Sequence, residues 1–237
     1  YIGYNVVGLI QPDDLVDYQN GDFTIRNGDD GNPLYVTTGN GEADNTPGMW
    51  KFEDVNGDGI INIEDRTVIG NPNPDFFFGW NNTFSYGKFR LSMFWQGSFG
   101  NDILNINKAF TGSGWSQGNG TEDWFNNRWT LDNQHNDIKW PSTGSPVVTS
   151  VPTSVLVEDG SYARLKNLTL RYTFPEVKGF KSINVFLTGT NLVTITNYTG
   201  QDPEVNTARN NSPLLRGIDY SAYPRAKSYT LGLNLNF

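Results

Sequence analysis

The chain has 237 residues, and 25 Asp and Glu against 17 Lys and Arg give it a formal net charge of −8. An acidic chain without a basic run is a poor nucleic-acid binder, because contacts to phosphates need clustered Lys and Arg. The absence of Cys excludes disulfides and thiol nucleophiles, and a single His leaves almost no room for a His-built site. Aromatic residues make up 14% of the chain and 26 residues are Gly, which favours strands and turns over helix bundles.

Residues 11–74 form a long stretch rich in Gly, Asn and Asp, with little periodicity, and the strongest local motif lies within it at 54–65. This segment closely matches the EF-hand loop, with Gly59 at the sharp turn. Oxygen ligands are expected from Asp54, Asn56, Asp58, Ile60 through its carbonyl, Asn62 and Asp65. Because these ligands are all hard oxygens, the motif predicts one structural Ca²⁺ that rigidifies the loop.

Two features of the motif depart from the EF-hand pattern. Asp65 is one methylene shorter than the usual bidentate Glu, and Gly70-Asn-Pro72 ends any following helix early. The alternative interpretation is an Asx-rich loop that holds itself by bonds from side chain to backbone.

The next two segments alternate with a period of two, which is typical of strands with two different faces. Over 76–86 one parity is aromatic and the other is mostly small or polar, and 88–99 repeats this pattern with Phe94 as the exception. The short connection at Gly87 predicts a hairpin.

Residues 100–158 return to a loop composition and hold weak catalytic patterns. The G-x-S-x-G match at 114–118 lacks the strand and helix that a nucleophile elbow requires, and acidic pairs such as Glu122/Asp123 are typical of loops. No catalytic residue is therefore predicted. The aromatic side chains of this loop suit either stacking on a substrate or packing of the loop itself; they are Trp115, Trp124, Phe125, Trp129 and Trp140.

Three further alternating segments follow, at 162–174, 182–195 and 227–237. In the first of them Arg164 and Lys166 break the pattern, because they share the parity of the apolar residues. Short turns join two strand pairs, whereas the other connections, 11–74, 100–158 and 198–223, are long. Long loops alternating with short turns fit an outer-membrane barrel with long extracellular loops.

The polar parity of the strands is mostly Asn, Ser, Thr, Gly and Gln, which suits a wet lumen behind an apolar face that meets lipid. The fold class predicted for 1–237 is all-β: C-terminal antiparallel strands of a large transmembrane β-barrel. Since five strands cannot close a membrane barrel, the chain is expected to be part of a longer protein. The alternative is a secreted, calcium-stabilised β-sandwich carbohydrate-binding module.

Several stretches together resemble the SusC/RagA-type TonB-dependent transporters of Bacteroidetes outer membranes, in the right order along nearly the whole chain. They are Lys51–Asn62, Glu64–Phe76, Phe94–Asp102, Asn127–Thr130, Val157–Leu170, Thr188–Leu192, Gly200–Asn206 and Tyr223–Ala226.

This resemblance implies a plugged barrel in the outer membrane of a Gram-negative cell, without enzymatic activity, that imports glycan or peptide oligomers. The implied partners are the remainder of the same transporter, a SusD-like surface lipoprotein and outer-membrane lipid. The plug domain and the segment that engages TonB are expected outside this chain. No substrate-contacting residue is assigned.

Overall fold

The computed structural model describes residues 1–20, 22–27, 46–59, 61–111, 120–142, 152–175, 178–205 and 216–237. The chain divides into two compact units. The loop unit contains Tyr1–Pro72, Ile103–Glu158 and Thr207–Ser221, and the sheet unit contains Asn73–Asp102, Asp159–Asn206 and Ala222–Phe237. Each unit therefore brings together segments that are distant in the sequence.

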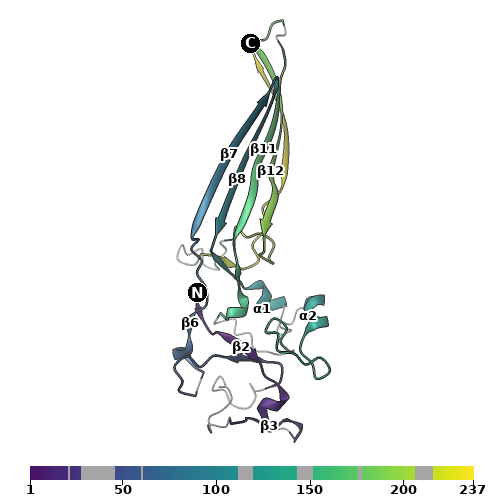
Figure 1. Cartoon of the computed structure of the whole chain (residues 1–237). Coiled ribbons are helices and arrows are strands. Elements are labelled where there is room, and N and C mark those ends of the chain that lie inside the picture. The colour runs from purple at the N-terminus through teal and green to yellow at the C-terminus, as the bar shows by residue number, and fades with distance from the viewer. Residues whose placement is uncertain are drawn as a thin grey trace. The chain divides into compact units, whose positions relative to one another are not determined.

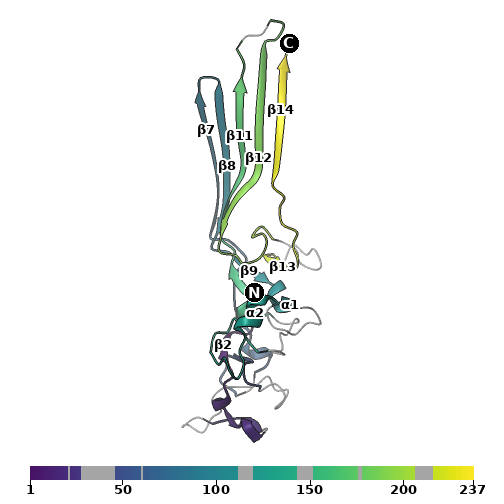
Figure 2. The same ribbon diagram turned by 90° about the vertical axis from the view of Figure 1, so that its right-hand side faces the viewer.

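The sheet unit is built on one antiparallel five-stranded sheet (Figures 1 and 2). Its strands are β7 (Phe76–Tyr86), β8 (Phe89–Phe99), β11 (Tyr162–Thr173), β12 (Ser182–Thr196) and β14 (Ser228–Asn236), in the order β14-β12-β11-β8-β7. All five predicted strands are confirmed to within one or two residues. The two tight turns lie at the same end of the sheet and contain Gly87 (φ 56°) and Gly179 (φ 92°), a conformation that glycine adopts without strain.

The register places like residues side by side across the sheet. One row of hydroxyl side chains crosses all five strands and consists of Thr83, Ser92, Thr169, Thr188 and Thr230. The adjacent row on the other face is apolar and consists of Phe84, Leu91, Leu170, Leu187 and Leu231. The sheet therefore has a polar face and an apolar face, as the alternation predicts.

A bulge at Lys166 explains the break in the pattern of β11. Leu165 and Asn167 pair with the consecutive residues Trp95 and Phe94 of β8, so Lys166 is the extra residue. One extra residue exchanges the faces of the strand beyond it. Arg164 consequently lies on the polar face although it shares the parity of Leu168.

Gly97 and Gly232 of the sheet lie where aromatic rings from a neighbouring strand cover them. A Cβ added to Gly232 would lie 2.1 Å from Cζ of Phe186. A Cβ added to Gly97 would lie 2.4 Å from Cε1 of Phe78 and 2.5 Å from the carbonyl oxygen of Tyr162. Because one of the atoms near Gly97 belongs to the backbone, a side chain there cannot be accommodated by a rotamer change alone.

The loop unit contains small sheets that the composition of these stretches did not predict. Its paired strands are β1 (Ile2–Gly3) with β6 (Thr67–Val68), β2 (Val6–Leu9) with β5 (Trp50–Phe52), β3 (Leu15–Asp17) with β4 (Asp22–Ile25), and the sheet of β10 (Val157–Asp159), β9 (Asp102–Asn105) and β13 (Ile218–Asp219). The helices are α1 (Asn107–Thr111) and α2 (Glu122–Asn127), and the 3₁₀ turns are Pro12–Asp14, Tyr18–Asn20, Ile63–Asp65 and Ser154–Leu156.

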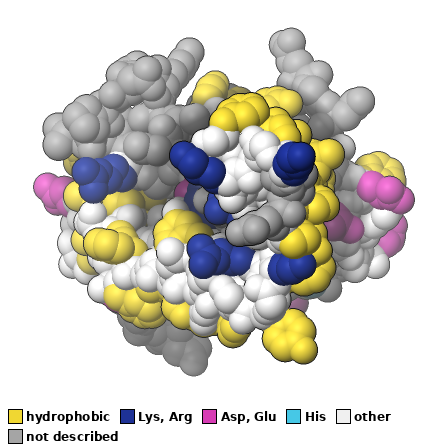
Figure 3. Space-filling view, turned by 90° about the horizontal axis from the view of Figure 1, so that it is seen from above, with side chains coloured by type: hydrophobic (Ala, Val, Ile, Leu, Met, Phe, Trp, Pro, Cys, Tyr) yellow, Lys and Arg dark blue, Asp and Glu magenta, His cyan; other side chains and the backbone are white. Residues whose placement is uncertain are grey.

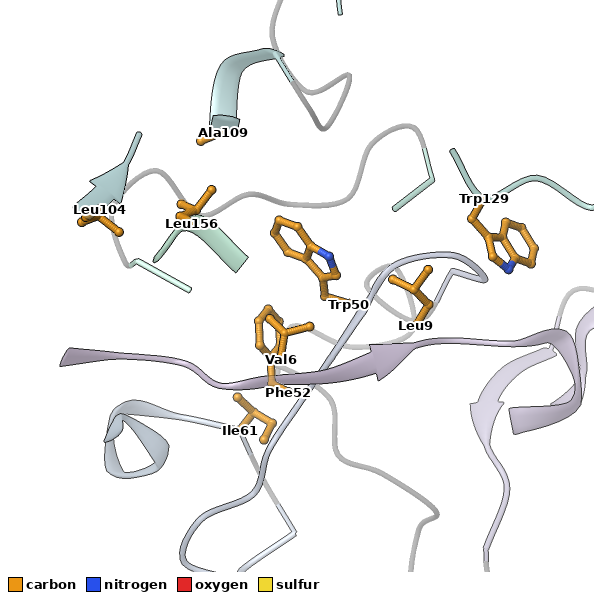
Figure 4. Packing of buried hydrophobic residues seen from close by; sticks show 9 residues of the cluster. All are labelled: Val6, Leu9, Trp50, Phe52, Ile61, Leu104, Ala109, Trp129 and Leu156. Atoms are coloured by element: carbon orange, nitrogen blue, oxygen red, sulfur yellow. The ribbon is translucent and has the colours of Figure 1, made fainter. Parts of the chain in front are cut away.

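A hydrophobic cluster joins the segments of the loop unit (Figure 4). Its buried members are Val6, Leu9, Trp50, Phe52, Ile61, Leu104, Ala109, Trp129 and Leu156. They come from separate parts of the sequence, which a periodicity search does not connect, and this explains why the local order was missed. Among the described residues, no helix is long and apolar enough to cross a membrane.

We expect Gly97→Ala to destabilise the sheet by about 1–3 kcal/mol, because the added methyl group has no room beside the Tyr162 carbonyl. Thr230→Ala, at an exposed position of β14, is the matched control. The measurement is the urea midpoint of the full-length protein, followed as the folded band on a gel run without boiling. Equal midpoints for the two variants would contradict the packing described for Gly97.

Candidate functional site

The apolar face of the sheet is exposed to an extent that water-facing strands rarely show. Tyr86 is 88% exposed, Leu231 74% and Tyr229 72%. Contiguous apolar surface of this kind marks a face that contacts lipid or another apolar partner.

Aromatic side chains gather near the two ends of this face, on either side of a band that contains Leu91, Met93, Leu168, Leu170, Leu187 and Leu231. Near the turns, the Phe89 and Tyr172 rings lie 4.8 Å apart and the Tyr172 and Phe174 rings 4.9 Å apart. At the opposite end, the Phe76 and Phe99 rings stack at 5.1 Å. From Tyr86 to Phe76 the strand covers ~33 Å. A strand of this length would span ~25 Å along the axis of a barrel with the usual tilt.

The polar face carries a buried cluster of charges at the end of the sheet away from the turns. Arg164 of β11 is only 2% exposed, and its guanidinium donates to the Asp202 carboxylate at 2.6 Å and to the Glu204 carboxylate. The Arg164 guanidinium also lies over the Tyr162 ring, 5.7 Å from its centroid. Arg164 therefore attaches the segment that follows β12 to the polar face of the sheet.

Glu204 is the most highly connected member of this cluster. Besides Arg164, its carboxylate accepts from Lys166 Nζ at 2.8 Å, from Gln96 Nε2 at 3.0 Å and pairs with Arg225 Nε at 3.1 Å. The Glu204 side chain is 12% exposed, and a carboxylate that is largely removed from water needs such partners because an uncompensated charge there is costly.

Asp202 connects the cluster to the segment that leads into β14. Burial raises the pKa of Asp202, but the Arg164 side chain and the backbone N–H groups of Arg225 and Glu204 outweigh this effect and hold the pKa below its ordinary value. The carboxylate is therefore ionised at neutral pH and holds both flanks of the long connection between β12 and β14.

The predicted calcium loop folds as a compact turn of the loop unit. The Asp54 carboxylate accepts from the backbone N–H groups of Gly57 at 2.7 Å and Gly59 at 2.9 Å, and both glycines have positive φ. The N–H group of Gly59 above all, together with those of Gly57 and Asp58 and the side chain of Asp65, lowers the pKa of Asp54. These are the bonds of the Asx-rich alternative.

Asp65 lies at the centre of this turn and is 0% exposed. Its two oxygens accept from the N–H groups of Val55 at 3.0 Å and Asn62 at 2.7 Å. The side chains of the motif offer only oxygen ligands, which fit a hard divalent cation.

The remaining predicted ligands are distributed as follows. The Asn56 amide donates to Asp58 at 3.1 Å, and Asn62 caps the following turn by accepting from Glu64 N–H at 2.7 Å. Ile60 lies outside the described residues. Within the described part of the chain, no three His, Cys, Asp or Glu side chains are grouped as a set of metal ligands.

The loop aromatics fall into different environments. Trp124 and Trp129 are buried, and their indole N–H groups donate to the Pro141 carbonyl and to Gln11. These two side chains therefore pack the loop unit, whereas Phe125 is exposed with the Arg128 guanidinium 4.3 Å above its ring. Trp115 and the G-x-S-x-G match lie outside the described residues.

The charge cluster on the polar face is the site that sequence reasoning missed. Its only local signal was that Arg164 and Lys166 share the parity of the apolar residues in their strand. The acidic partners of Arg164 lie 38 and 40 positions away. Since the cluster depends on the fold of the β12–β14 connection, the pairing was not accessible from periodicity.

Known proteins resemble this chain over all or most of its length, although no protein-family model matches it. TonB-dependent receptor P3 of Formosa agariphila is 37% identical over 100% of the chain, and TonB-dependent receptor P26 of the same organism is 39% identical over 79%. TonB-dependent receptor SusC of Bacteroides thetaiotaomicron is 28% identical over 78%. The chain spans 22%, 19% and 17% of these relatives, respectively.

Solved structures of the RagAB peptide importer share the fold. In the open-open state the match covers 100% of this chain and 22% of the other, with 24% identity and a TM-score of 0.67. In the closed-closed state the match covers 100% and 23%, with 22% identity and a TM-score of 0.68. The prediction of an all-β, antiparallel fold of this type is confirmed.

We expect Arg164→Met to cost about 3–5 kcal/mol, because Asp202 and Glu204 would keep their burial and lose their main partner. The measurement is hydrogen exchange of 198–205 in the full-length protein, with Lys139→Met, an exposed residue of the loop unit, as control. Unchanged protection of 198–205 in Arg164→Met would show that the cluster does not hold this segment.

Docking of the same segment should depend on pH in the acid range. Since the pKa of Asp202 is lowered on folding, its stabilising contribution is present above the ordinary Asp pKa of ~3.9 and is lost as the pH falls through the lowered value. The protection factor of 198–205, which is the exchange rate corrected for the intrinsic pH dependence of amide exchange, should therefore be constant from pH 7 to 5 and fall only in strong acid. A loss of protection centred near pH 6 would contradict the assignment.

Proposed function

Because this chain is a segment of a SusC/RagA-type TonB-dependent transporter, we propose that its five-stranded sheet forms part of a barrel wall in the outer membrane. The observation that carries the proposal is the pair of opposite faces, one apolar with aromatic ends and one lined by hydroxyls and amides. The apolar face contacts lipid, and the polar face lines the lumen.

The whole protein, on this proposal, is a non-enzymatic importer of glycan or peptide oligomers. It works with a SusD-like surface lipoprotein and draws energy from TonB through a part of the polypeptide outside this chain. The similarity to SusC and to a structure described as a peptide importer supports this class of activity. The loop unit would then lie on the extracellular side, where it meets substrate and partner.

A secreted β-sandwich module is the competing interpretation. A sandwich strand buries its apolar side against a second sheet. In the part of the chain that the structure describes, Leu231, Leu233 and Tyr229 of β14 are instead exposed by 60% or more. This exposure favours the membrane wall.

The two faces give a matched pair of variants at adjacent positions of β11. Leu170→Arg places a charge on the apolar face and should cost about 2–4 kcal/mol if this face meets the membrane midplane. Thr169→Arg places the same charge on the polar face and should be tolerated. The measurement is the amount of heat-modifiable, full-length protein in the outer membrane. Equal amounts of the two variants, or recovery of both in the soluble fraction, would contradict the proposed wall.

We also propose that the 54–65 loop binds one structural Ca²⁺ through oxygens of Asp54, Asn56, Asp58, Ile60, Asn62 and Asp65. The oxygen-only ligand set of the motif and its turn through Gly57 and Gly59, both with positive φ, support this proposal. When bound, the ion would supply rigidity to the loop and no chemical step.

Calcium binding should protect the loop from proteolysis. Lys51 lies next to the motif, so Lys-C cleavage after Lys51 in the full-length protein should accelerate when Ca²⁺ is chelated. Asp58→Asn should raise the Ca²⁺ concentration needed for protection about tenfold or more, whereas Asp137→Asn, outside the loop, should not. If Ca²⁺ does not change the rate of cleavage, the calcium proposal is wrong and the loop is held by its own hydrogen bonds.

A further inference from the structure

Two arginines face each other on the polar side of the sheet, near the turns. Arg90 of β8 and Arg171 of β11 are direct cross-strand partners, and both side chains are exposed. They lie one row beyond the hydroxyl pair of Ser92 and Thr169. Like charges directly opposite each other destabilise a sheet, so this pair calls for a compensating anion.

The sheet itself offers no such anion. Its five strands contain four basic residues, Arg90, Arg164, Lys166 and Arg171, and no Asp or Glu. Arg164 and Lys166 are neutralised by Asp202 and Glu204. Within the described residues, neither Arg90 nor Arg171 forms an ion pair.

The acidic segment that serves Arg164 cannot also serve Arg171. The two residues lie seven positions apart, and with the bulge at Lys166 the separation is ~20 Å along the strand. Near the turns the sequence adds Lys88, Lys178 and Lys181, and one acid, Glu176, which lies outside the described residues. Figure 3 shows basic side chains around this end of the sheet.

We propose that Arg90 and Arg171 are a docking site for carboxylates of an acidic segment that belongs to the same, longer polypeptide and lies inside the barrel. The proposal rests on the proposed function, because it takes the polar face as the lumen. Guanidinium groups bind carboxylates through paired hydrogen bonds, and two adjacent guanidiniums fit one or two such groups.

Three observations favour this occupant. The arginines lie on the face opposite the aromatic belts, so lipid phosphates are on the wrong side of the sheet. The same face already uses carboxylates from a distant segment to neutralise Arg164. The relatives are several times longer than this chain, since it spans 22% of TonB-dependent receptor P3, which leaves ample polypeptide to supply the acids.

A carbodiimide cross-link tests the contact directly. In the full-length protein in outer membranes, Arg171→Lys introduces an amine that the reagent couples as an amide to any carboxylate within contact distance. Lys166 is the positive control in the same molecule, because its Nζ lies 2.8 Å from Glu204. Thr230→Lys places an amine on the same face but two strands away and one row farther from the turns, ~12 Å distant, and is the matched control.

The proposal predicts, by peptide mass spectrometry, a cross-link from position 171 to an Asp or Glu of the same polypeptide outside residues 1–237, at least tenfold more abundant than from position 230. A cross-link to Glu176, to another protein, or to no carboxylate while the Lys166 link forms would overturn it. If only the docking proposal fails, Arg171→Lys still reaches the outer membrane and is still heat-modifiable. If the barrel assignment fails, the protein has neither property.

Discussion

The alternation of side chains across the long sheet is the constraint on which the other features depend. Successive residues of a strand point to opposite faces, so a shift by one residue would move Leu170 to the polar face and Thr169 to the apolar face. The register avoids this because the hydroxyl row and the apolar row each cross all five strands without a break. Cross-strand bonds such as Thr169 to Thr188 at 2.8 Å add to the preference for this register.

The bulge at Lys166 uses the same constraint to change what one strand presents. Before the bulge, Tyr162 and Arg164 lie on the polar face, and beyond it Leu168 and Leu170 lie on the apolar face. The exchange places a buried arginine where the connection between β12 and β14 supplies Asp202 and Glu204. A local irregularity of one residue therefore determines where a distant acidic segment is held.

The strands were predictable from the sequence because alternation is local, and each predicted strand matches β7, β8, β11, β12 or β14. The hairpin at Gly87 was predictable for the same reason. The cluster around Arg164 was not, since its partners lie about 40 positions away. The loop unit was predicted only as loop, because its core joins residues as distant as Val6 and Leu156. Calcium binding at 54–65 stays a prediction.

The central claim is that the apolar face meets lipid and that the faces exchange at Lys166. Single nitroxide labels at 161–172, introduced through cysteine into a full-length protein otherwise free of cysteine and reconstituted in bilayers, would test both parts by collision with oxygen and with a polar nickel complex. The account predicts high oxygen contact at 168, 170 and 172 and low oxygen contact at 167, 169 and 171. Before the bulge, it predicts high oxygen contact at 163 and 165, which have the opposite parity. Uniform accessibility along β11, or an alternation that continues unshifted through Lys166, would contradict it.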